Sequence, residues 1–305
     1  MKKLFIPIVI VALLVSCNKN AKSGDDKATN EKFEKYKEGF ITDLWKLNPD
    51  WAASQGYHKF DSVLVIPNAE NQKKQLAFAN SQLDSLKQYP LEGLSDNNKT
   101  DFYMIKNQLE GTLFSIKELK SSEWNPSSYN VCGAFAEILN GKYDSLDVRL
   151  RNFNLKMNGI PAYYEAAKSN IKNPTKEHTA LAIDQNLGGT SVFKEDLVAA
   201  LSKSKLSAEE KKSIIDKANV SVKAITDYAN WLKQLDNKTP RSFRLGAELY
   251  AKKFNFDIES GYTADEIYKI AVYHQNDLHD KMFVLANKSW TKYNGNAVKR
   301  TDKIE

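Results

Sequence analysis

The sequence predicts an all-α fold, a multi-helix array of about ten helices, from three observations. Apolar side chains recur every three or four residues along most of the chain, which is the period of one helix face. Two segments, residues 207–210 (SAEE) and 263–266 (TADE), have the pattern of capping boxes at helix starts. Runs of β-branched residues are scarce, and residues 62–66 (SVLVI) are expected to form one short extended segment.

The first helix is predicted over residues 33–47, where apolar side chains follow one face. A second helix is expected to start at Asn48-Pro49-Asp50. Asparagine can cap a helix, proline suits its first position, and an acidic side chain is favourable at the positive helix end. Gly56 is a natural stop, because glycine adopts the left-handed conformation at a helix C-terminus without strain.

Further apolar stripes at helical spacing predict the remaining helices. The clearest stripes cover residues 76–86, 102–116, 146–157, 214–232 and 267–285. Ser95 is expected to open the helix that carries the second of these stripes. We expect the last stripe to be exposed, as an apolar surface that belongs to a missing half of a longer protein. The alternative is that it packs entirely on the helices before it.

The N-terminus has the pattern of a bacterial secretory signal. Lys2 and Lys3 precede an apolar run over residues 4–15, which is short of the roughly 20 residues that a membrane-spanning helix needs. Leu14-Val15-Ser16-Cys17 follows at the position of the cleavage site and is typical of a lipobox. We therefore predict lipidation at Cys17. The alternative is an ordinary signal peptide with a chance cysteine.

Cleavage before Cys17 predicts a signal peptide (1–16), a lipidated flexible tether (17–29) and a helical domain (30–305). The tether is polar and lacks aromatic residues, a composition that does not support a packed core. The expected partner is a membrane, reached through the lipid anchor, and the expected location is the cell envelope. Asn18 is not the aspartate associated with inner-membrane retention in some bacteria, so we expect the outer membrane.

Composition excludes some classes of function. The net charge is +6, but 44 basic and 38 acidic residues are interspersed without a basic block, so nucleic acid is not an expected partner. The chain has two cysteines, and lipidation of Cys17 leaves Cys132 without an intramolecular partner. Cys132 is therefore expected to be a small buried hydrophobic residue, and the fold to depend on its core and not on disulfides.

Residue patterns for metal binding or nucleophilic catalysis are missing from the sequence. The only close histidine pair, His274 and His279, is five residues apart, which separates the two side chains by about 140° around a helix. Two histidines on one helix need a spacing of four to share a metal ion. The sequence has no G-x-S-x-G motif and no glycine-rich phosphate loop. We therefore predict no catalytic residue and no metal or cofactor site in this chain.

Arginine is scarce beside lysine, which makes its positions informative. Arg241 and Arg244 are three residues apart, about one helical turn, and could face a common acidic partner. A guanidinium group suits bidentate recognition of a carboxylate, so this pair is a candidate carboxylate site. The alternative is a pair of salt bridges that fix helix packing.

The segment around the second helix resembles a known family signature. It contains N-P-x-x-A-x-x-x-G-Y-H-x-x-D, with Asn48, Pro49, Gly56, His58 and Asp61 at the signature positions. Residues 149–153 (RLRNF), residues 244–246 (RLG) and the helix start at 263–267 also resemble segments of this family. The family is the bacterial domain of unknown function 885, and the resemblance spans roughly residues 33–285.

The resemblance implies a protein of the zinc metallopeptidase type with a helical gluzincin fold, about twice the length of this chain. The family's zinc motif lies in its second half, so zinc and a peptide substrate are expected only in a longer form. The chain is accordingly expected to be the N-terminal helical part of such a protein, as a partial or a natural short form, and inactive alone. The alternatives are a non-catalytic lipoprotein that captures peptide or glycan at the cell surface and a structural partner of an envelope complex.

Overall fold

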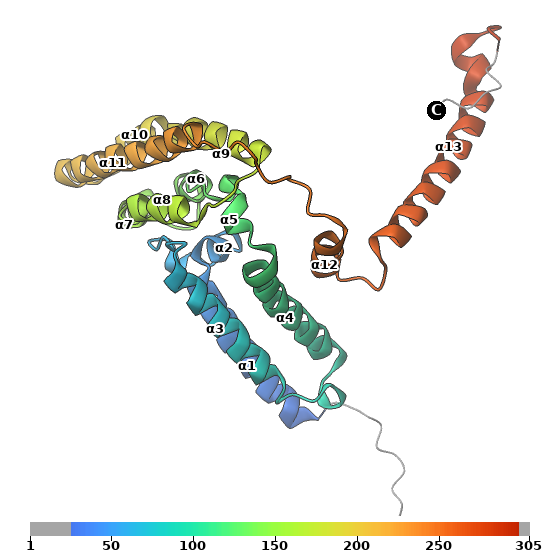
Figure 1. Ribbon diagram of the computed structural model, residues 1–305, viewed down its shortest axis with the longest axis horizontal. Helices are drawn as coiled ribbons and strands as arrows, with labels where there is room; N and C mark the ends of the chain where they lie inside the picture. The colour runs from blue at the N-terminus through green and yellow to red at the C-terminus, as the bar shows by residue number, and fades with distance from the viewer. Residues whose placement is uncertain (1–25, 299–305) are drawn as a thin grey trace, which may run out of the picture.

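The computed structural model describes residues 26–298, and this part of the chain is helical without a β-strand (Figure 1). The all-α prediction is therefore confirmed. Thirteen α-helices are present in the described residues, and ten of them have nine residues or more. Residues 63–67 have no regular secondary structure, so the short run expected to be extended is a connecting strap.

The helices follow one another through short connections. Their bounds are α1 (Lys27–Leu47), α2 (Pro49–Ser54), α3 (Ala69–Leu86), α4 (Asp96–Phe114), α5 (Ser121–Trp124), α6 (Cys132–Asn140), α7 (Leu146–Met157), α8 (Ile160–Asn170), α9 (Lys176–Gly189), α10 (Leu197–Lys203), α11 (Ala208–Lys233), α12 (Ala247–Ile258) and α13 (Ala264–Asn294). Two π-helical turns, η3 (Ser115–Leu119) and η5 (Val192–Asp196), follow α4 and precede α10.

The first core lies between α1, α3 and α4, which run side by side (Figure 1). Phe33 and Leu109 are buried at its centre, and the ring of Phe33 meets Tyr89 edge-on at 5.0 Å. The carboxylate of Asp26 caps α1 by accepting the backbone N–H of Ala28 at 3.1 Å. Helix α1 thus begins at Lys27, three residues before the domain boundary predicted at residue 30.

The second core is built from α6 to α11. Its centre is a group of three buried rings, Phe135, Phe153 and Phe193, with Phe135 4.7 Å from Phe153 and 4.9 Å from Phe193. Full burial of each such side chain contributes about 1.5–3 kcal/mol. Both predicted capping boxes form, at Ser207 before α11 and at Thr263 before α13, and Ser95 caps α4 as expected.

Helix α12 packs against α4, and α13 then extends away from the rest of the protein (Figure 1). Phe256 of α12 lies 5.2 Å from the ring of Phe114, and Asn107 donates to the backbone oxygen of Phe256 at 2.9 Å. No residue of α13 is buried. Ile270, Leu278, Met282 and Leu285 of its apolar stripe are exposed, from 42% at Ile270 to 64% at Met282, whereas Ile267 is half-buried. The predicted exposure is thus confirmed for most of the stripe.

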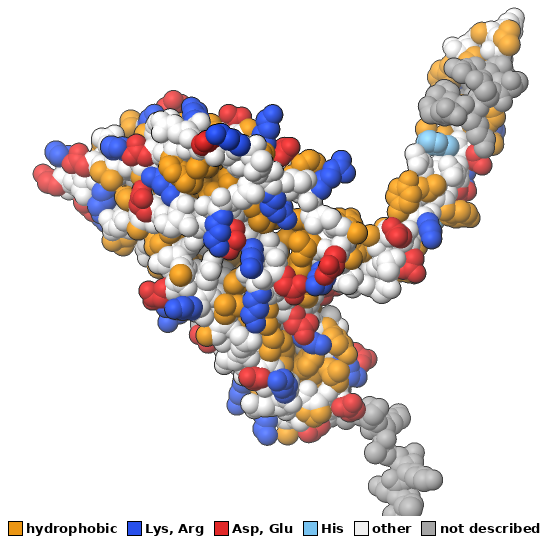
Figure 2. Space-filling model, viewed as in Figure 1, with side chains coloured by type: hydrophobic (Ala, Val, Ile, Leu, Met, Phe, Trp, Pro, Cys, Tyr) orange, Lys and Arg blue, Asp and Glu red, His pale blue; other side chains and the backbone are white. Residues whose placement is uncertain are grey.

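Figure 2 shows hydrophobic side chains along the visible face of α13, among scattered charges. His274 on this helix is exposed, with its ring beside that of Tyr273, and not packed in a core. Each helix within residues 26–298 is too short or too polar to cross a lipid bilayer. The predicted signal peptide, Cys17 and most of the predicted tether lie outside the described residues.

Candidate functional site

The signature residues lie at the two ends of α2, with Asn48 and Pro49 at its start and Gly56, His58 and Asp61 after its end. Asn48 was expected to cap α2, but its side chain instead donates to the backbone oxygen of Leu44 at 3.0 Å, which closes the end of α1. Pro49 is the buried first residue of α2, as predicted. Gly56 has φ +83° directly after α2, the left-handed conformation that ends the helix.

His58 and Asp61 meet Tyr143, which comes from the loop before α7. The Asp61 carboxylate is 1% exposed, accepts a hydrogen bond from the Tyr143 hydroxyl, and lies 3.2 Å from Nδ1 of His58. The His58 and Tyr143 rings stack in parallel with centroids 3.3 Å apart. Burial, and then the Asp61 carboxylate, raise the pKa of Tyr143. The three side chains therefore act as a polar clamp between two distant segments.

Gly141 is required for this clamp because Tyr143 folds back over it. A Cβ atom at Gly141 would lie 2.5 Å from Cε1 of the Tyr143 ring, closer than such contacts occur. Sequence reasoning missed Tyr143, since nothing in its local pattern marks it. Its role depends on a contact with a residue 82 positions away.

A second contact joins the same segments. The Lys156 ammonium is 1% exposed and pairs with the Asp50 carboxylate, which is half exposed. Lys156 lies on the apolar face of α7, three residues after Phe153, so its helix position was a signal that sequence reasoning overlooked. Arg149, on the same face, donates from Nη1 to the backbone oxygens of Ile138 and Leu139 at 2.7 Å each and holds the end of α6.

The strap after the signature also lies against the second core. Leu64 packs on Gly159, where an added Cβ would meet Leu64 Cβ at 3.1 Å. Asn170 donates to the backbone oxygen of Pro67 at 2.5 Å. The signature residues and this strap thus form a joint between the two cores. We call the His58–Asp61–Tyr143 clamp, the Asp50–Lys156 pair and these strap contacts the signature joint.

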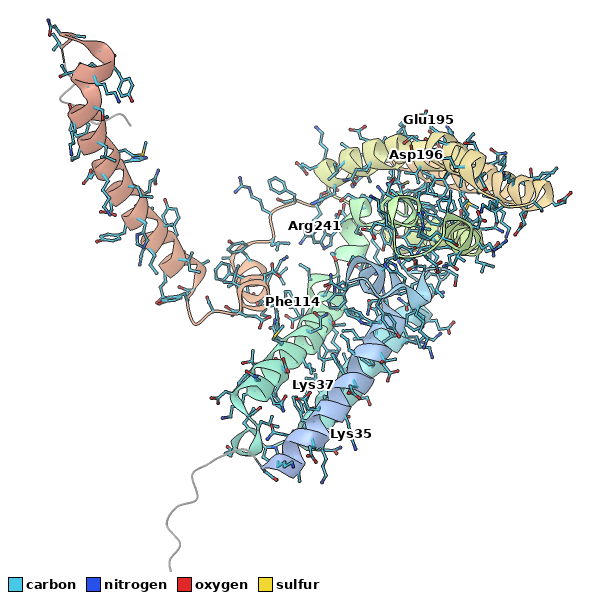
Figure 3. The ribbon with its side chains drawn as sticks, turned by 180° about the vertical axis from the view of Figure 1, so that it is seen from behind. Lys35, Lys37, Phe114, Glu195, Asp196 and Arg241 are labelled. Atoms are coloured by element: carbon cyan, nitrogen blue, oxygen red, sulfur yellow. The ribbon has the colours of Figure 1, made fainter. Side chains whose placement is uncertain are left out.

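Two grooves flank α1. One lies between α1, α2 and α4, with a volume of about 560 Å³ and a largely apolar lining that includes Ile41 and Met104. In it Trp45 meets Trp51 edge-on at 5.1 Å. Lys37 of α1 reaches across to Asp101 of α4 at 2.5 Å at its rim (Figure 3).

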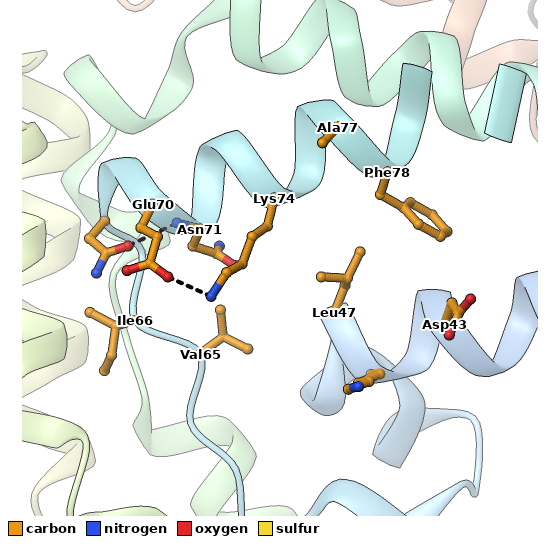
Figure 4. Close-up of a pocket in the computed structure, with 11 residues that line it drawn as sticks. Asp43, Leu47, Val65, Ile66, Glu70, Asn71, Lys74, Ala77 and Phe78 are labelled. Atoms are coloured by element: carbon orange, nitrogen blue, oxygen red, sulfur yellow. Dashed lines mark hydrogen bonds and ion pairs between the residues drawn. The ribbon is translucent and has the colours of Figure 1, made fainter. Parts of the chain in front are cut away.

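The second groove lies between the end of α1, the strap and α3, with a volume of about 740 Å³ (Figure 4). Glu70 and Lys74, one turn apart on α3, form an ion pair at 2.7 Å in this groove. Val65 and Ile66 of the strap line it from the other side. The strap therefore helps to shape a groove as well as joining the cores.

Arg241 and Arg244 do not share a helix face, because both lie in the irregular segment between α11 and α12. The prediction that they are one helical turn apart is therefore wrong. The Arg241 guanidinium lies 4.3 Å from the ring centroid of Trp124 in α5 (Figure 3), while Arg244 is exposed beside Phe243. Neither arginine forms an ion pair with any residue in 26–298, which also argues against the salt-bridge alternative.

Metal-ligating side chains are not gathered in the described part of the chain. Within residues 26–298, no three histidine, cysteine or acidic side chains come close enough to hold a metal ion. The described residues therefore do not fit a zinc site. Cys132 is buried against Gly189, and burial raises the pKa of its thiol to about 11. It is a small core residue, as predicted, and a poor nucleophile at neutral pH.

Metal analysis tests the expected lack of a zinc site. The purified mature chain, without an affinity tag, is expected to contain well under one zinc ion per molecule after dialysis, because a tight site needs three or four convergent ligands. Elemental analysis by mass spectrometry measures this ratio. Stoichiometric zinc that survives dialysis would contradict the prediction.

Residues 49–303 match a family described as "Bacterial protein of unknown function (DUF885)". The chain belongs to this family. A solved structure described as that of "a putative lipoprotein of unknown function" from Shewanella oneidensis is similar, with a TM-score of 0.80 and 41% identity over 88% of this chain. This chain covers 50% of that protein, so it spans about half of the relative's length. No curated protein matches the chain.

The match gives the signature joint a family context. It begins at Pro49 and so includes Gly56, His58 and Asp61, the residues that connect the two cores. The resemblance seen in the sequence is confirmed for the family. In this chain those residues pack, turn and clamp, and none of them lies beside a nucleophile or a metal-binding cluster in the described residues.

Proposed function

We propose that this DUF885 member is the amino-terminal helical part of a lipid-anchored envelope protein of the zinc metallopeptidase type. In this proposal a second half supplies zinc and the catalytic residues, and the present half supplies scaffold and peptide-binding surface. Zinc in such proteins activates a water molecule for attack on a peptide bond. No residue of this chain is assigned to the metal.

One observation carries the proposal: an apolar helix face is uncovered in a chain that spans half of its structural relative. Leu278, Met282 and Leu285 of α13 stand on that face with more than half of each side chain exposed. Apolar faces of this kind on soluble proteins mark surfaces where another protein part packs. The second half of a longer family member is the partner that this argument supports.

Zinc content and hydrolysis by the longer protein test the peptidase part of the proposal. The Shewanella oneidensis relative is expected to bind about one zinc ion per catalytic site and to hydrolyse unstructured peptides, with loss of activity in a chelator. A chimera that joins this chain to the relative's other half is expected to behave in the same way. The assay on the relative itself is decisive, because a chimera can lose activity by misfolding. A folded, zinc-supplemented relative without hydrolysis would contradict the proposal.

Lipid anchoring is tested at Cys17. In a bacterial host, Cys17→Ala is expected to leave an unprocessed or soluble protein, because two or three acyl chains at about 0.8 kcal/mol per buried CH₂ provide the anchor. Detergent-phase partitioning and mass spectrometry of the N-terminus measure the change, and Cys132→Ala is the matched control. Unchanged partitioning and unchanged size for Cys17→Ala would refute lipidation. Separation of inner and outer membranes of the wild type tests the proposed outer-membrane location.

A second function, capture of peptide or glycan without catalysis, is favoured by the groove between α1, α2 and α4. Its lining is mostly apolar and carries two tryptophan rings, which suits a ligand with an apolar or sugar face. Saturable binding by the metal-free chain, accompanied by a change in tryptophan fluorescence, would favour this function over the first. Binding only by the longer, zinc-containing protein would favour the first.

A further inference from the structure

A small pocket lies where four segments meet beside Trp124. It has a volume of about 230 Å³, below the size of pockets that enclose drug-sized ligands, and suits one end of a molecule. Its walls come from the end of η3, from α5, from the loop after α8, and from the α11–α12 segment with the start of α12. Leu119, Trp124 and Leu249 provide the apolar part of the lining.

The charges around this pocket do not cancel. Its two acidic side chains already have basic partners, since Glu123 pairs with Lys172 and Glu118 pairs with Lys252, each at 2.7 Å. Arg241 and Lys120 also line the pocket, and neither forms an ion pair with a residue in 26–298. The pocket therefore presents two cations without a counter-charge from the described chain.

The platform under Arg241 is fixed by hydrogen bonds. Trp124 donates from Nε1 to the backbone oxygen of Leu119 at 2.9 Å, and its own backbone oxygen accepts from Thr175 at 3.1 Å. The ring of His178 meets the Trp124 ring edge-on at 5.7 Å. The indole is thus held by Leu119 and His178, and the Trp124 backbone by Thr175, before any ligand arrives. A pre-organised site of this kind loses little conformational entropy on binding.

Arg241 lies over Trp124 and keeps N–H groups for a ligand. Its guanidinium carbon is 4.3 Å from the centroid of the Trp124 ring, and the N–H groups of a guanidinium lie in its own plane. One nitrogen, Nη1, donates to the backbone oxygen of Ser242 at 3.0 Å. The remaining N–H groups can donate to a planar anion, and a carboxylate matches their spacing.

We propose that this pocket binds the free carboxylate at the C-terminus of a peptide, through Arg241 and Lys120. The last side chain of the peptide packs on Leu119, Trp124 and Leu249. Naming a peptide as the ligand rests on the proposed function. The site itself needs neither zinc nor the second half of a longer protein.

Paired peptides with and without the carboxylate test the site. The probes are N-acetyl-glycyl-leucine and its C-terminal amide, titrated by calorimetry into the full chain carrying Cys17→Ala for solubility. The acid is expected to bind at least about tenfold more tightly than the amide, because a hydrogen bond to a charged group is stronger than one to a neutral group. Equal affinities would overturn the proposal, and this comparison on the unaltered pocket needs no variant to fold.

Two arginine variants test whether Arg241 causes the tighter binding of the acid. Arg241→Gln is expected to weaken binding of the acid about tenfold, to the level of the amide, while Arg244→Gln leaves it unchanged. Lys120→Gln is expected to give a smaller loss in the same direction. Unchanged binding in Arg241→Gln, or an equal loss in Arg244→Gln, would overturn the assignment. Acetate that competes as strongly as the peptide would overturn the peptide part.

The outcome is independent of the peptidase assay. Equal binding of the acid and the amide by the metal-free chain would show that this pocket is not a carboxylate site. That result would say nothing about zinc-dependent hydrolysis by the longer relative. A relative that lacks zinc and hydrolysis removes the proposed function, and the affinities of this chain for the two probes remain measurable. Circular dichroism of each variant establishes that a lost affinity comes from a folded protein.

Discussion

Asp50→Asn is expected to lower the free energy of unfolding by about 2–3 kcal/mol, whereas Lys156→Met is expected to change it by less than about 1 kcal/mol. The two side chains form one ion pair, but they differ in exposure, 50% for Asp50 and 1% for Lys156. Removing the carboxylate leaves a buried ammonium group without a counter-charge. Removing the ammonium leaves a carboxylate that water already reaches, and methionine fills the vacated volume.

Urea unfolding followed by far-ultraviolet circular dichroism measures both changes, and the double variant Asp50→Asn/Lys156→Met gives the coupling free energy. The matched control is Asp216→Asn, which removes the acid from an exposed pair with Lys212 and is expected to cost less than about 0.5 kcal/mol. A larger loss for Lys156→Met than for Asp50→Asn would contradict the prediction. It would mean that Asp50 does not stabilise the buried Lys156 ammonium group.

The asymmetry matters because Asp50 and Lys156 belong to the signature joint. Asp50 follows Pro49 directly in α2, and Lys156 is on α7 in the second core. The clamp of His58, Asp61 and Tyr143 joins the same two regions. The joint therefore holds α1 and its flanking grooves at a fixed position relative to the second core. The family signature therefore has a structural role in connecting the two cores.

Local pattern is sufficient to predict the helices. Period and capping act within a few residues, so the sequence alone assigns Ser95, Ser207 and Thr263 as helix starts, and each of them caps a helix. The apolar stripe on α13 is also predictable, because its side chains recur at helical spacing after the Thr263 cap. These inferences need no information about which segments meet in space.

Contacts between distant segments are not predictable in the same way. Tyr143 reaches Asp61 across 82 positions, and the contact of Arg241 with Trp124 joins segments that no local pattern relates. The arginine pair is wrongly placed on a helix because spacing alone cannot distinguish a helical turn from an irregular segment. Asn48 shows the same limit, since its side chain can cap the helix that follows or close the helix before it, and here it does the latter.

Replacing the apolar stripe of α13 by polar residues is expected to abolish self-association without loss of stability. The change is Ile270→Gln, Leu278→Gln, Met282→Gln and Leu285→Gln in one variant. These side chains are exposed, so they contribute little apolar burial to folding, and glutamine retains a high helix propensity. The wild-type chain is expected to bind a hydrophobic dye and to form larger species through this face.

Dye fluorescence, light scattering and thermal unfolding measure the three properties on the same samples. The quadruple variant is expected to lose most of the dye signal and to become monomeric, with its cooperative unfolding unchanged.

The control is Ile225→Ser on α11, a fully buried position. Its free energy of unfolding is expected to fall by about 3 kcal/mol or more, since a cavity and a buried hydroxyl are both created. If the wild-type chain is instead monomeric, silent to the dye and cooperative in unfolding, α13 needs no cover. A second half is then not needed to cover α13, and capture of a ligand by the chain alone becomes the better-supported function.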